Sequence, residues 1–201
     1  MGFVLYQSPT LCLIRSQTTT GSGRSQPPDL IRTGVVRPIQ PKQASSAVTS
    51  EGYKLLDIRP AWEWEKARVR SAIHIPLFLE DTDSSPITFI KKSIHFGYIG
   101  LWTGQLLTTI NDGFLDEVRT TFPDKDEKLL VACGEGLRSR VAVSALHKDG
   151  YRNLGWLAGG FSRASEKDFA NVEGQSKLQY ATIGGVSYIF LRLLILLRVL
   201  K

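Results

Sequence analysis

Apolar residues along the middle of the chain fall into short continuous runs that are separated by longer segments with helical spacing. KLLDIRP (54–60) and EKLLVAC (127–133) are short apolar runs, and nearly continuous burial of this kind is expected of strands inside a parallel sheet. SAIHIP (71–76), which a proline ends, and NLGWLAGGF (153–161) indicate two further short strands.

Between these runs, apolar residues recur at helical spacing. The pattern predicts helices over residues 61–69, over the first half of 86–112, over 113–122 and over 138–150. We expect the second of these helices to be broken by Gly97, Gly100 and Gly104. Strands that alternate with helices predict an α/β fold, an open parallel sheet flanked by helices, with a ligand site at the carboxyl ends of the strands.

The N-terminal residues have a different composition. They are rich in Ser, Thr, Gln and Pro, and Asp29 is the single acidic residue among the first 50. This composition is typical of an organelle transit peptide, although a disordered tail shares much of it. We therefore expect a transit peptide or disordered leader over 1–45 and a folded domain over 46–172.

The C-terminal residues 181–201 predict a hydrophobic helix. Twelve Leu, Ile, Phe and Val residues favour bilayer insertion by about 0.3 to 0.6 kcal/mol each, whereas Arg192 near the centre opposes it by about 2.5 to 3.5 kcal/mol. Such a helix suits a membrane anchor or an interfacial placement, and the alternative is a terminal helix packed on the domain or on a partner subunit.

Charge and composition exclude several classes of function. The net charge of +6 comes from the two ends of the chain, and the middle is close to balanced, so nucleic acid is not an expected partner. Two cysteines give no disulfide framework, and the three histidines lack the paired spacings that bind zinc. We expect no metal and no cofactor.

The sequence VACGEGLRSRVAV (131–143) holds the candidate chemistry. If a strand ends at Cys133 and a helix begins a few residues later, the thiol lies where unpaired amides and the helix dipole stabilise a thiolate. Gly134 and Gly136 allow the backbone to curl around an anion, and Arg138 adds a cation. A lone cysteine at a strand end is often only a small buried apolar residue, but that alternative does not explain the glycines and the arginine.

Four motifs in this order resemble the rhodanese-like sulfurtransferases. CGEGLRS (133–139) is similar to their CxxGxRS active-site loop, LLDIRP (55–60) to their DxR strand end, SAIHIP to their GAxxIP segment and LGWLAGGF (154–161) to their LxGGxxxW motif. Together they cover about residues 50–170. GYIGLWTGQ (97–105) and ATIGGVS (181–187) resemble segments of plant chloroplast proteins that have one rhodanese-like domain.

The resemblance implies a persulfide mechanism, in which the Cys133 thiolate takes a sulfur atom from a sulfane-sulfur donor and passes it to a thiol or another nucleophilic acceptor. It implies that the substrate-binding residues are Gly134, Glu135, Gly136, Leu137, Arg138 and Ser139, whose amides stabilise the sulfur anion. Asp57 and Arg59 are expected to support this loop.

The resemblance also implies a chloroplast location, at the thylakoid or envelope membrane if the C-terminal helix contacts lipid. The alternative function is a non-catalytic rhodanese-like module that binds or tethers a partner at a chloroplast membrane.

Two details of the loop bear on its substrate. Glu135 stands where family members that use thiosulfate often carry a basic side chain, so a dianionic donor is disfavoured. From Cys133 to Arg138 the loop spans six residues, one fewer than in the family's phosphatase relatives, and the shorter loop favours sulfur over phosphate.

Overall fold

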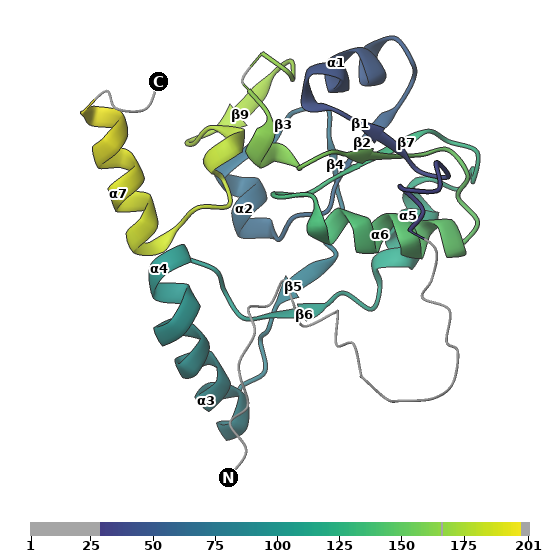
Figure 1. Ribbon diagram of the computed structural model, residues 1–201. Coiled ribbons are helices and arrows are strands. Elements are labelled where there is room, and N and C mark those ends of the chain that lie inside the picture. Colours follow the sequence, from purple (N-terminus) through teal and green to yellow (C-terminus); the bar gives the residue numbers. More distant parts are fainter. Residues whose placement is uncertain (1–28, 166, 198–201) are drawn as a thin grey trace, which may run out of the picture.

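A five-stranded parallel sheet forms the centre of the computed structural model, which describes residues 29–165 and 167–197 (Figure 1). The strand order is β1-β8-β7-β2-β4, and each neighbouring pair is parallel. The bounds are β1 Arg37–Ile39, β2 Lys54–Asp57, β4 Ile73–His74, β7 Leu129–Ala132 and β8 Leu154–Leu157. This arrangement confirms the predicted α/β class.

The sheet separates two apolar layers because successive side chains of a strand point to opposite faces. In β2, Leu56 belongs to the layer that holds helices α5 (Phe114–Thr121) and α6 (Leu137–Lys148). Leu55 belongs to the other layer, which includes α1 (Pro41–Thr49). β7 is buried on both faces, as its continuous apolar sequence predicts.

Two small antiparallel pairs and several short helices complete the domain. β3 (Ala67–Val69) pairs with β9 (Val172–Gly174), and β5 (Phe78–Glu80) pairs with β6 (Thr108–Ile110). The remaining helices are α2 Ala61–Lys66, α3 Pro86–His95, η1 Phe96–Gly100, α4 Leu101–Thr103, η2 Phe161–Arg163, η3 Leu178–Tyr180 and α7 Gly185–Leu196. Helices α3, η1 and α4 form one arm that projects from the domain, and α7 begins next to α4, at the end of the arm nearer the sheet, and runs at an angle to it (Figure 1).

Two expected helices differ from those observed. The helix predicted over 61–69 ends at Lys66, because residues 67–69 form β3 and hydrogen-bond to β9 instead. Gly97 and Gly100 do not break the second helix, which passes through them as the π-helical turn η1. The helix ends at Gly104, which has a left-handed backbone with φ of +69°.

The folded region begins earlier than the sequence indicated. β1 forms an edge of the sheet beside β8, and the expected boundary between residues 45 and 46 falls inside α1. The composition of this segment misled the prediction, since its Pro, Gln and Ser residues lie at the start and on the exposed side of a short helix that buries Ala44 and Ala47. The leader prediction for residues 1–28 falls outside the described residues.

The hydrophobic C-terminal helix expected over 181–201 is observed as α7, which begins at Gly185 and ends at Leu196. Residues 198–201 lie outside the described part of the chain. Within the part that the structure describes, none of the helices has the length and apolar character that a bilayer crossing requires.

Candidate functional site

Cys133 follows the last residue of β7, in the centre of the sheet, and α6 begins four residues later at Leu137. The loop between them reverses direction at Gly136, whose φ of +89° is a conformation that glycine adopts without strain. A Cβ at this position would also come within 3.2 Å of Gly159 and 3.1 Å of the Trp156 ring. The predicted placement of the thiol at a strand end and a helix start is therefore observed.

The Cys133 sulfur is held by polar groups of its own loop. The amide of Gly136 donates to Sγ at 3.1 Å and the amide of Ser139 at 3.4 Å, while the thiol donates to Ser139 Oγ at 3.3 Å. Ser139 Oγ donates in turn to the Gly136 carbonyl, and Trp156 Nε1 donates to both Gly136 O and Ser139 Oγ. Two amides thus point at the sulfur, as expected for a site that stabilises a sulfur anion.

The turn after β8 fixes the other side of the loop. The amide of Phe161 donates to the Cys133 carbonyl at 2.9 Å and the amide of Ser162 donates to the Gly134 carbonyl at 2.8 Å. Gly160 permits this approach, since a Cβ there would lie 2.4 Å from the Cys133 carbonyl oxygen. The two glycines of LGWLAGGF therefore serve the loop through close backbone packing.

Arg138 forms an ion pair with Glu63 of α2. Arg138 Nη2 lies 2.8 Å from Glu63 Oε2, and Glu63 is fully buried while 21% of the Arg138 side chain is exposed. Burial alone lowers the pKa of Arg138, but the charge of Glu63 and its hydrogen bond outweigh burial and raise that pKa above its usual value. Arg138 remains a cation whose charge is largely balanced within the protein.

Asp57 and Arg59 form a second, fully buried ion pair at the adjacent strand end. Arg59 Nε lies 3.0 Å from both Asp57 carboxylate oxygens, and its Nη2 lies 2.6 Å from Oδ2. Arg59 Nη2 also donates to the Ala67 carbonyl, and the guanidinium stacks 4.4 Å from the Phe161 ring. This pair connects β2, β3 and η2, and the supporting role expected of both residues stays a prediction.

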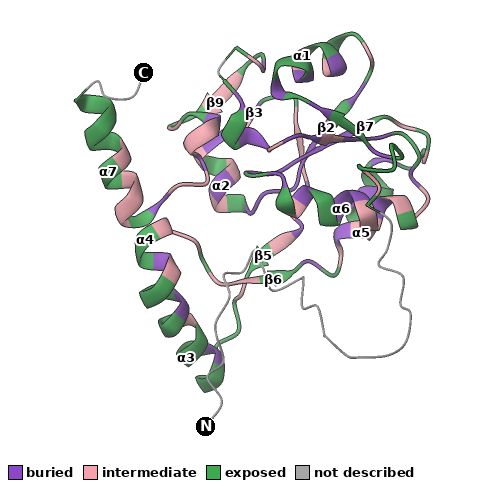
Figure 2. Ribbon diagram, in the orientation of Figure 1, coloured by how far each residue is buried: buried purple, intermediate pink, exposed green. Residues whose placement is uncertain are grey.

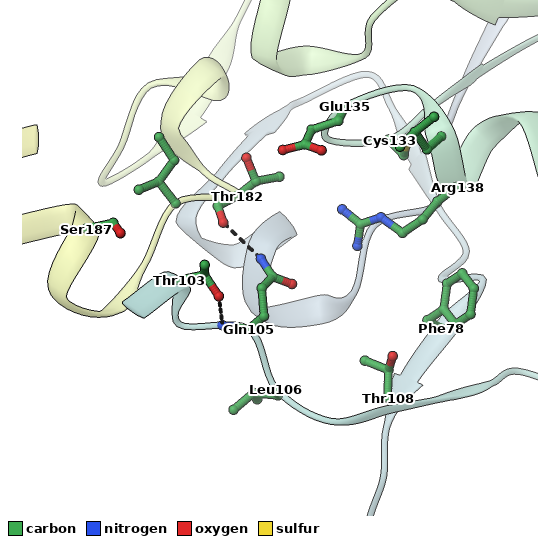
Figure 3. Close-up of a pocket in the computed structure, with 12 residues that line it drawn as sticks. Phe78, Thr103, Gln105, Leu106, Thr108, Cys133, Glu135, Arg138, Thr182 and Ser187 are labelled. Atoms are coloured by element: carbon green, nitrogen blue, oxygen red, sulfur yellow. Dashed lines mark hydrogen bonds between the residues drawn. The ribbon is translucent and has the colours of Figure 1, made fainter. Parts of the chain in front are cut away.

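A cavity of about 340 Å³ opens beside the loop (Figure 3). Cys133, Glu135, Leu137 and Arg138 contribute to its wall from the loop side. The remaining wall is formed by residues of three other segments, namely Phe78, Thr103, Gln105, Leu106, Thr108, Thr182, Ile183 and Ser187. Three of the six loop residues expected to bind substrate line the cavity, namely Glu135, Leu137 and Arg138. The other three, Gly134, Gly136 and Ser139, are not among the lining residues.

The segment that precedes α7 covers the loop. Gln105 Nε2 donates to the Thr182 carbonyl at 2.9 Å, and this bond is drawn in Figure 3. A Cβ on Gly134 would lie 2.1 Å from Thr182 Cγ2, so a larger residue at 134 would displace this cover. Lys66 Nζ donates to the Ile183 carbonyl at 3.4 Å from the other side. The C-terminal segment is thus part of the site.

Glu63 and Thr182 were missed from the sequence. Glu63 lies in AWEWEKARV beside Glu65, and nothing in the pattern distinguishes the buried glutamate from its neighbour. ATIGGVS resembles a segment of single-domain chloroplast proteins, yet no local signal in it indicates that it reaches the loop. In the described residues, no group of three or more His, Cys, Asp or Glu side chains could hold a metal ion.

The model of the rhodanese-like domain family matches residues 40–167. The chain belongs to the rhodanese-like family. The part of the chain that the family model matches ends before β9, so the segment with Thr182 and α7 lies beyond the family domain.

Similar curated proteins support the same assignment. Rhodanese-like domain-containing protein 10 of Arabidopsis thaliana is 60% identical over 169 residues, which cover 84% of this chain and 79% of that protein. Rhodanese-like domain-containing protein 11, chloroplastic, from the same plant is 38% identical over 79% of this chain and 53% of its own length.

A solved rhodanese-like domain from Anabaena is similar at 14% identity and a TM-score of 0.46, over 68% of this chain and 78% of that one.

Proposed function

We propose that this rhodanese-like protein is a sulfurtransferase that carries a sulfane sulfur on Cys133 as a persulfide. The observation that carries the proposal is the Cys133 sulfur, which accepts hydrogen bonds from the amides of Gly136 and Ser139. Cys133 is fully buried, and it is one of the residues that line a cavity large enough for a small donor. Amides aimed at an atom stabilise negative charge there without reorganisation, which suits a sulfur that is an anion before the first transfer and again after the second.

In the first step, the Cys133 thiolate attacks the outer sulfur of a donor. A bond forms between Sγ and that sulfur, the donor's own sulfur bond breaks, and its electron pair leaves with the rest of the donor as a thiolate or a sulfite. The protein then holds a persulfide on Cys133, which lines the cavity together with Glu135 and Arg138.

In the second step, the thiolate of an acceptor attacks the outer sulfur of the persulfide. A new sulfur–sulfur bond forms on the acceptor, the bond to Sγ breaks, and Cys133 returns as a thiolate. No external oxidant or reductant is needed, because the sulfur atom moves at a constant oxidation state. The Gly136 and Ser139 amides stabilise the leaving Cys133 thiolate in this step as they stabilise the attacking one in the first.

The charges around the cavity favour a donor that carries little negative charge. Glu63 balances Arg138, and Glu135 adds a carboxylate to the wall without an ion-pair partner among the described residues. A dianion such as thiosulfate is repelled by Glu135, and the charge of Arg138 is already balanced by Glu63. Members of the family that use thiosulfate often have a basic residue where this chain has Glu135. An organic persulfide suits the site better.

The experiment that tests this function is intact-mass measurement after incubation with a persulfide donor and removal of excess donor. We expect the full chain to gain the mass of one sulfur atom and to lose it on treatment with a reducing thiol. Cys133→Ser should gain nothing, and Cys12→Ser should gain one sulfur, because the chain has only these two cysteines. Lack of any gain with persulfide and thiosulfate donors would overturn the proposal and favour the non-catalytic module.

We also propose that the protein works in chloroplasts. Residues 1–28 carry no acidic side chain, as is typical of transit peptides, and two relatives are named as chloroplastic. The test is import of the full chain into isolated chloroplasts, followed by protease treatment of the organelles. We expect a protected, shortened protein, and a variant without residues 1–28 should stay accessible to protease. Import that does not depend on these residues would contradict the proposal.

A further inference from the structure

Two helical segments outside the sheet carry an unusual number of exposed apolar side chains. They are residues 86–103, which comprise α3, η1 and α4, and residues 185–197, which comprise α7 and Leu197; together we call them the two-helix surface. Among the described residues, most of the large apolar side chains that face solvent belong to this surface. Figure 2 shows both segments as mainly exposed, in contrast to the domain beside them.

The two segments are joined by close backbone contact. A Cβ on Gly104 would lie 2.7 Å from Gly184 Cα, and a Cβ on Gly185 would lie 2.3 Å from the Leu101 carbonyl oxygen. Only glycines allow the chains to approach this closely. Since α4 and α7 meet at this crossing and Gln105 binds the Thr182 carbonyl, the two segments hold a fixed relation to each other and to the domain.

The distribution of apolar residues on α7 identifies the kind of partner. Leu193, Leu194, Ile195 and Leu196 are consecutive and all exposed, and four consecutive residues take in a full turn of an α-helix. A protein groove or a second copy of the chain covers one stripe of a helix, whereas the acyl region of a lipid layer surrounds most of its circumference.

Charge favours a lipid surface that is anionic. Residues 84–111 contain no Asp or Glu, and neither do residues 174–201, whereas Lys91, Lys92 and Arg192 lie within the two-helix surface. The exposed rings of Tyr98 and Trp102 are of the type that settles at the boundary of headgroups and acyl chains. Basic and apolar helices without acidic residues bind in the plane of anionic membranes.

We propose that the two-helix surface seats the protein on an anionic lipid bilayer, with both segments embedded in one leaflet at the boundary of the headgroups and the acyl chains instead of crossing the membrane. The twelve residues of α7 measure about 18 Å as an α-helix, which is shorter than the bilayer core of about 30 Å. The proposal differs from a C-terminal anchor because α3, η1 and α4 share the contact. It is independent of whether Cys133 transfers sulfur.

The test is flotation of the full chain with vesicles that contain phosphatidylcholine alone or a mixture with phosphatidylglycerol. We expect binding to the mixed vesicles that weakens at high salt, and at least about a tenfold loss of binding in each of Ile90→Glu on α3 and Phe190→Glu on α7. Val141→Glu on α6 is the matched control, since Val141 is 40% exposed outside the surface, and its binding should not change. Circular dichroism checks that each variant is folded.

Three outcomes would overturn the proposal. One is failure of the full chain to float with the mixed vesicles. Another is loss of binding in Phe190→Glu but not in Ile90→Glu, which would leave a C-terminal anchor alone. The last is a dimer, detected by analytical ultracentrifugation without lipid, that both variants dissociate while flotation stays unchanged, because the surface would then be an interface between copies of the chain.

Discussion

Arg138 of the cysteine loop lies 2.8 Å from the fully buried carboxylate of Glu63, so the arginine that lines the cavity together with Cys133 is paired with a neighbouring helix. The pair fixes the loop to α2 and reduces the positive charge that the cavity presents. Because Glu63 has no exposed surface, removing Arg138 leaves a buried carboxyl group without its partner, and removing Glu63 leaves the Arg138 guanidinium unpaired.

Glu63→Gln should therefore lower the free energy of unfolding and change donor preference. We expect a loss of about 2 to 3 kcal/mol, because Arg138 keeps its charge without its partner. With Arg138 unpaired, loading of Cys133 from thiosulfate should improve relative to loading from an organic persulfide. Urea unfolding and intact-mass loading with the two donors measure these effects.

Glu173→Gln is the matched control for this variant, since Glu173 pairs with Arg68 and Arg70 on the surface. Its stability should change by less than about 1 kcal/mol and its donor preference should not change. If both substitutions change the free energy of unfolding and the donor preference equally, the burial of Glu63 does not explain the effect of Glu63→Gln.

Gly134 and Thr182 should be energetically coupled. Gly134→Ala places a Cβ 2.1 Å from Thr182 Cγ2, so it should destabilise the chain by about 1 to 3 kcal/mol and displace the cover over the loop. Adding Thr182→Ala removes the methyl group that the new Cβ meets. A double-mutant cycle from urea unfolding should give a favourable coupling of at least about 1 kcal/mol, and additive effects would show that the C-terminal segment does not pack on the loop.

Much of the fold was predictable because it depends on local patterns. The buried strands β2 and β7 have continuous apolar sequences, and α6 has both a glycine start and an Asp-Gly end. The exceptions depend on distant partners. Residues 67–69 continue a helical pattern, yet they form β3 because β9, about a hundred residues later, supplies its hydrogen bonds.

The residues of the candidate site also divide into those that a local pattern predicts and those that come from distant segments. Cys133 and its loop amides lie within seven residues, so sequence alone located them. Asp57 and Arg59 were located by the motif that they share. Glu63, Gln105 and Thr182 come to the loop from segments up to about seventy residues away on either side, and their residue types are common on any surface. Only the folded arrangement identifies them.

Ser139→Ala tests the hydroxyl group at the sulfur while leaving the Ser139 amide in place. Ser139 Oγ accepts from the thiol and from Trp156 Nε1, and it donates to the Gly136 carbonyl. Loss of this polar contact should slow persulfide formation by about tenfold, less than loss of a full oxyanion donor does. Single-turnover mass measurements give the rate. Val141→Ala, on the outer face of the same helix, should load at the normal rate, and an unchanged rate in Ser139→Ala would exclude the hydroxyl from the reaction.

Acid should weaken the fold through Asp149, which follows α6. Hydrogen bonds from Arg119 and then Lys125 lower the pKa of Asp149 to about 2. A lowered folded pKa means that the carboxylate adds stability above its unfolded pKa of about 4, and that this contribution disappears as pH falls from about 4 to about 2.

Asp149→Asn should therefore be less stable than the parent by about 1 kcal/mol at pH 6, and the difference should shrink toward zero near pH 2. Urea unfolding of both proteins from pH 6 to pH 2 measures it. Asp116→Asn, at the exposed partner of Arg119, is the control and should have a smaller effect. A constant difference over the whole range would contradict the assignment.

If Cys133 passes its sulfur on, labelled sulfur that is loaded on the chain should move to an added thiol. The chain is loaded with an isotopically labelled sulfane sulfur, freed of donor, and mixed with a small thiol, and the mass of both partners is followed in time. We expect the label to leave the protein and to appear as a persulfide on the thiol in equal amount, and we expect Cys133→Ser to deliver none. Label that stays on the protein, or that reaches the thiol equally from Cys133→Ser, would contradict it.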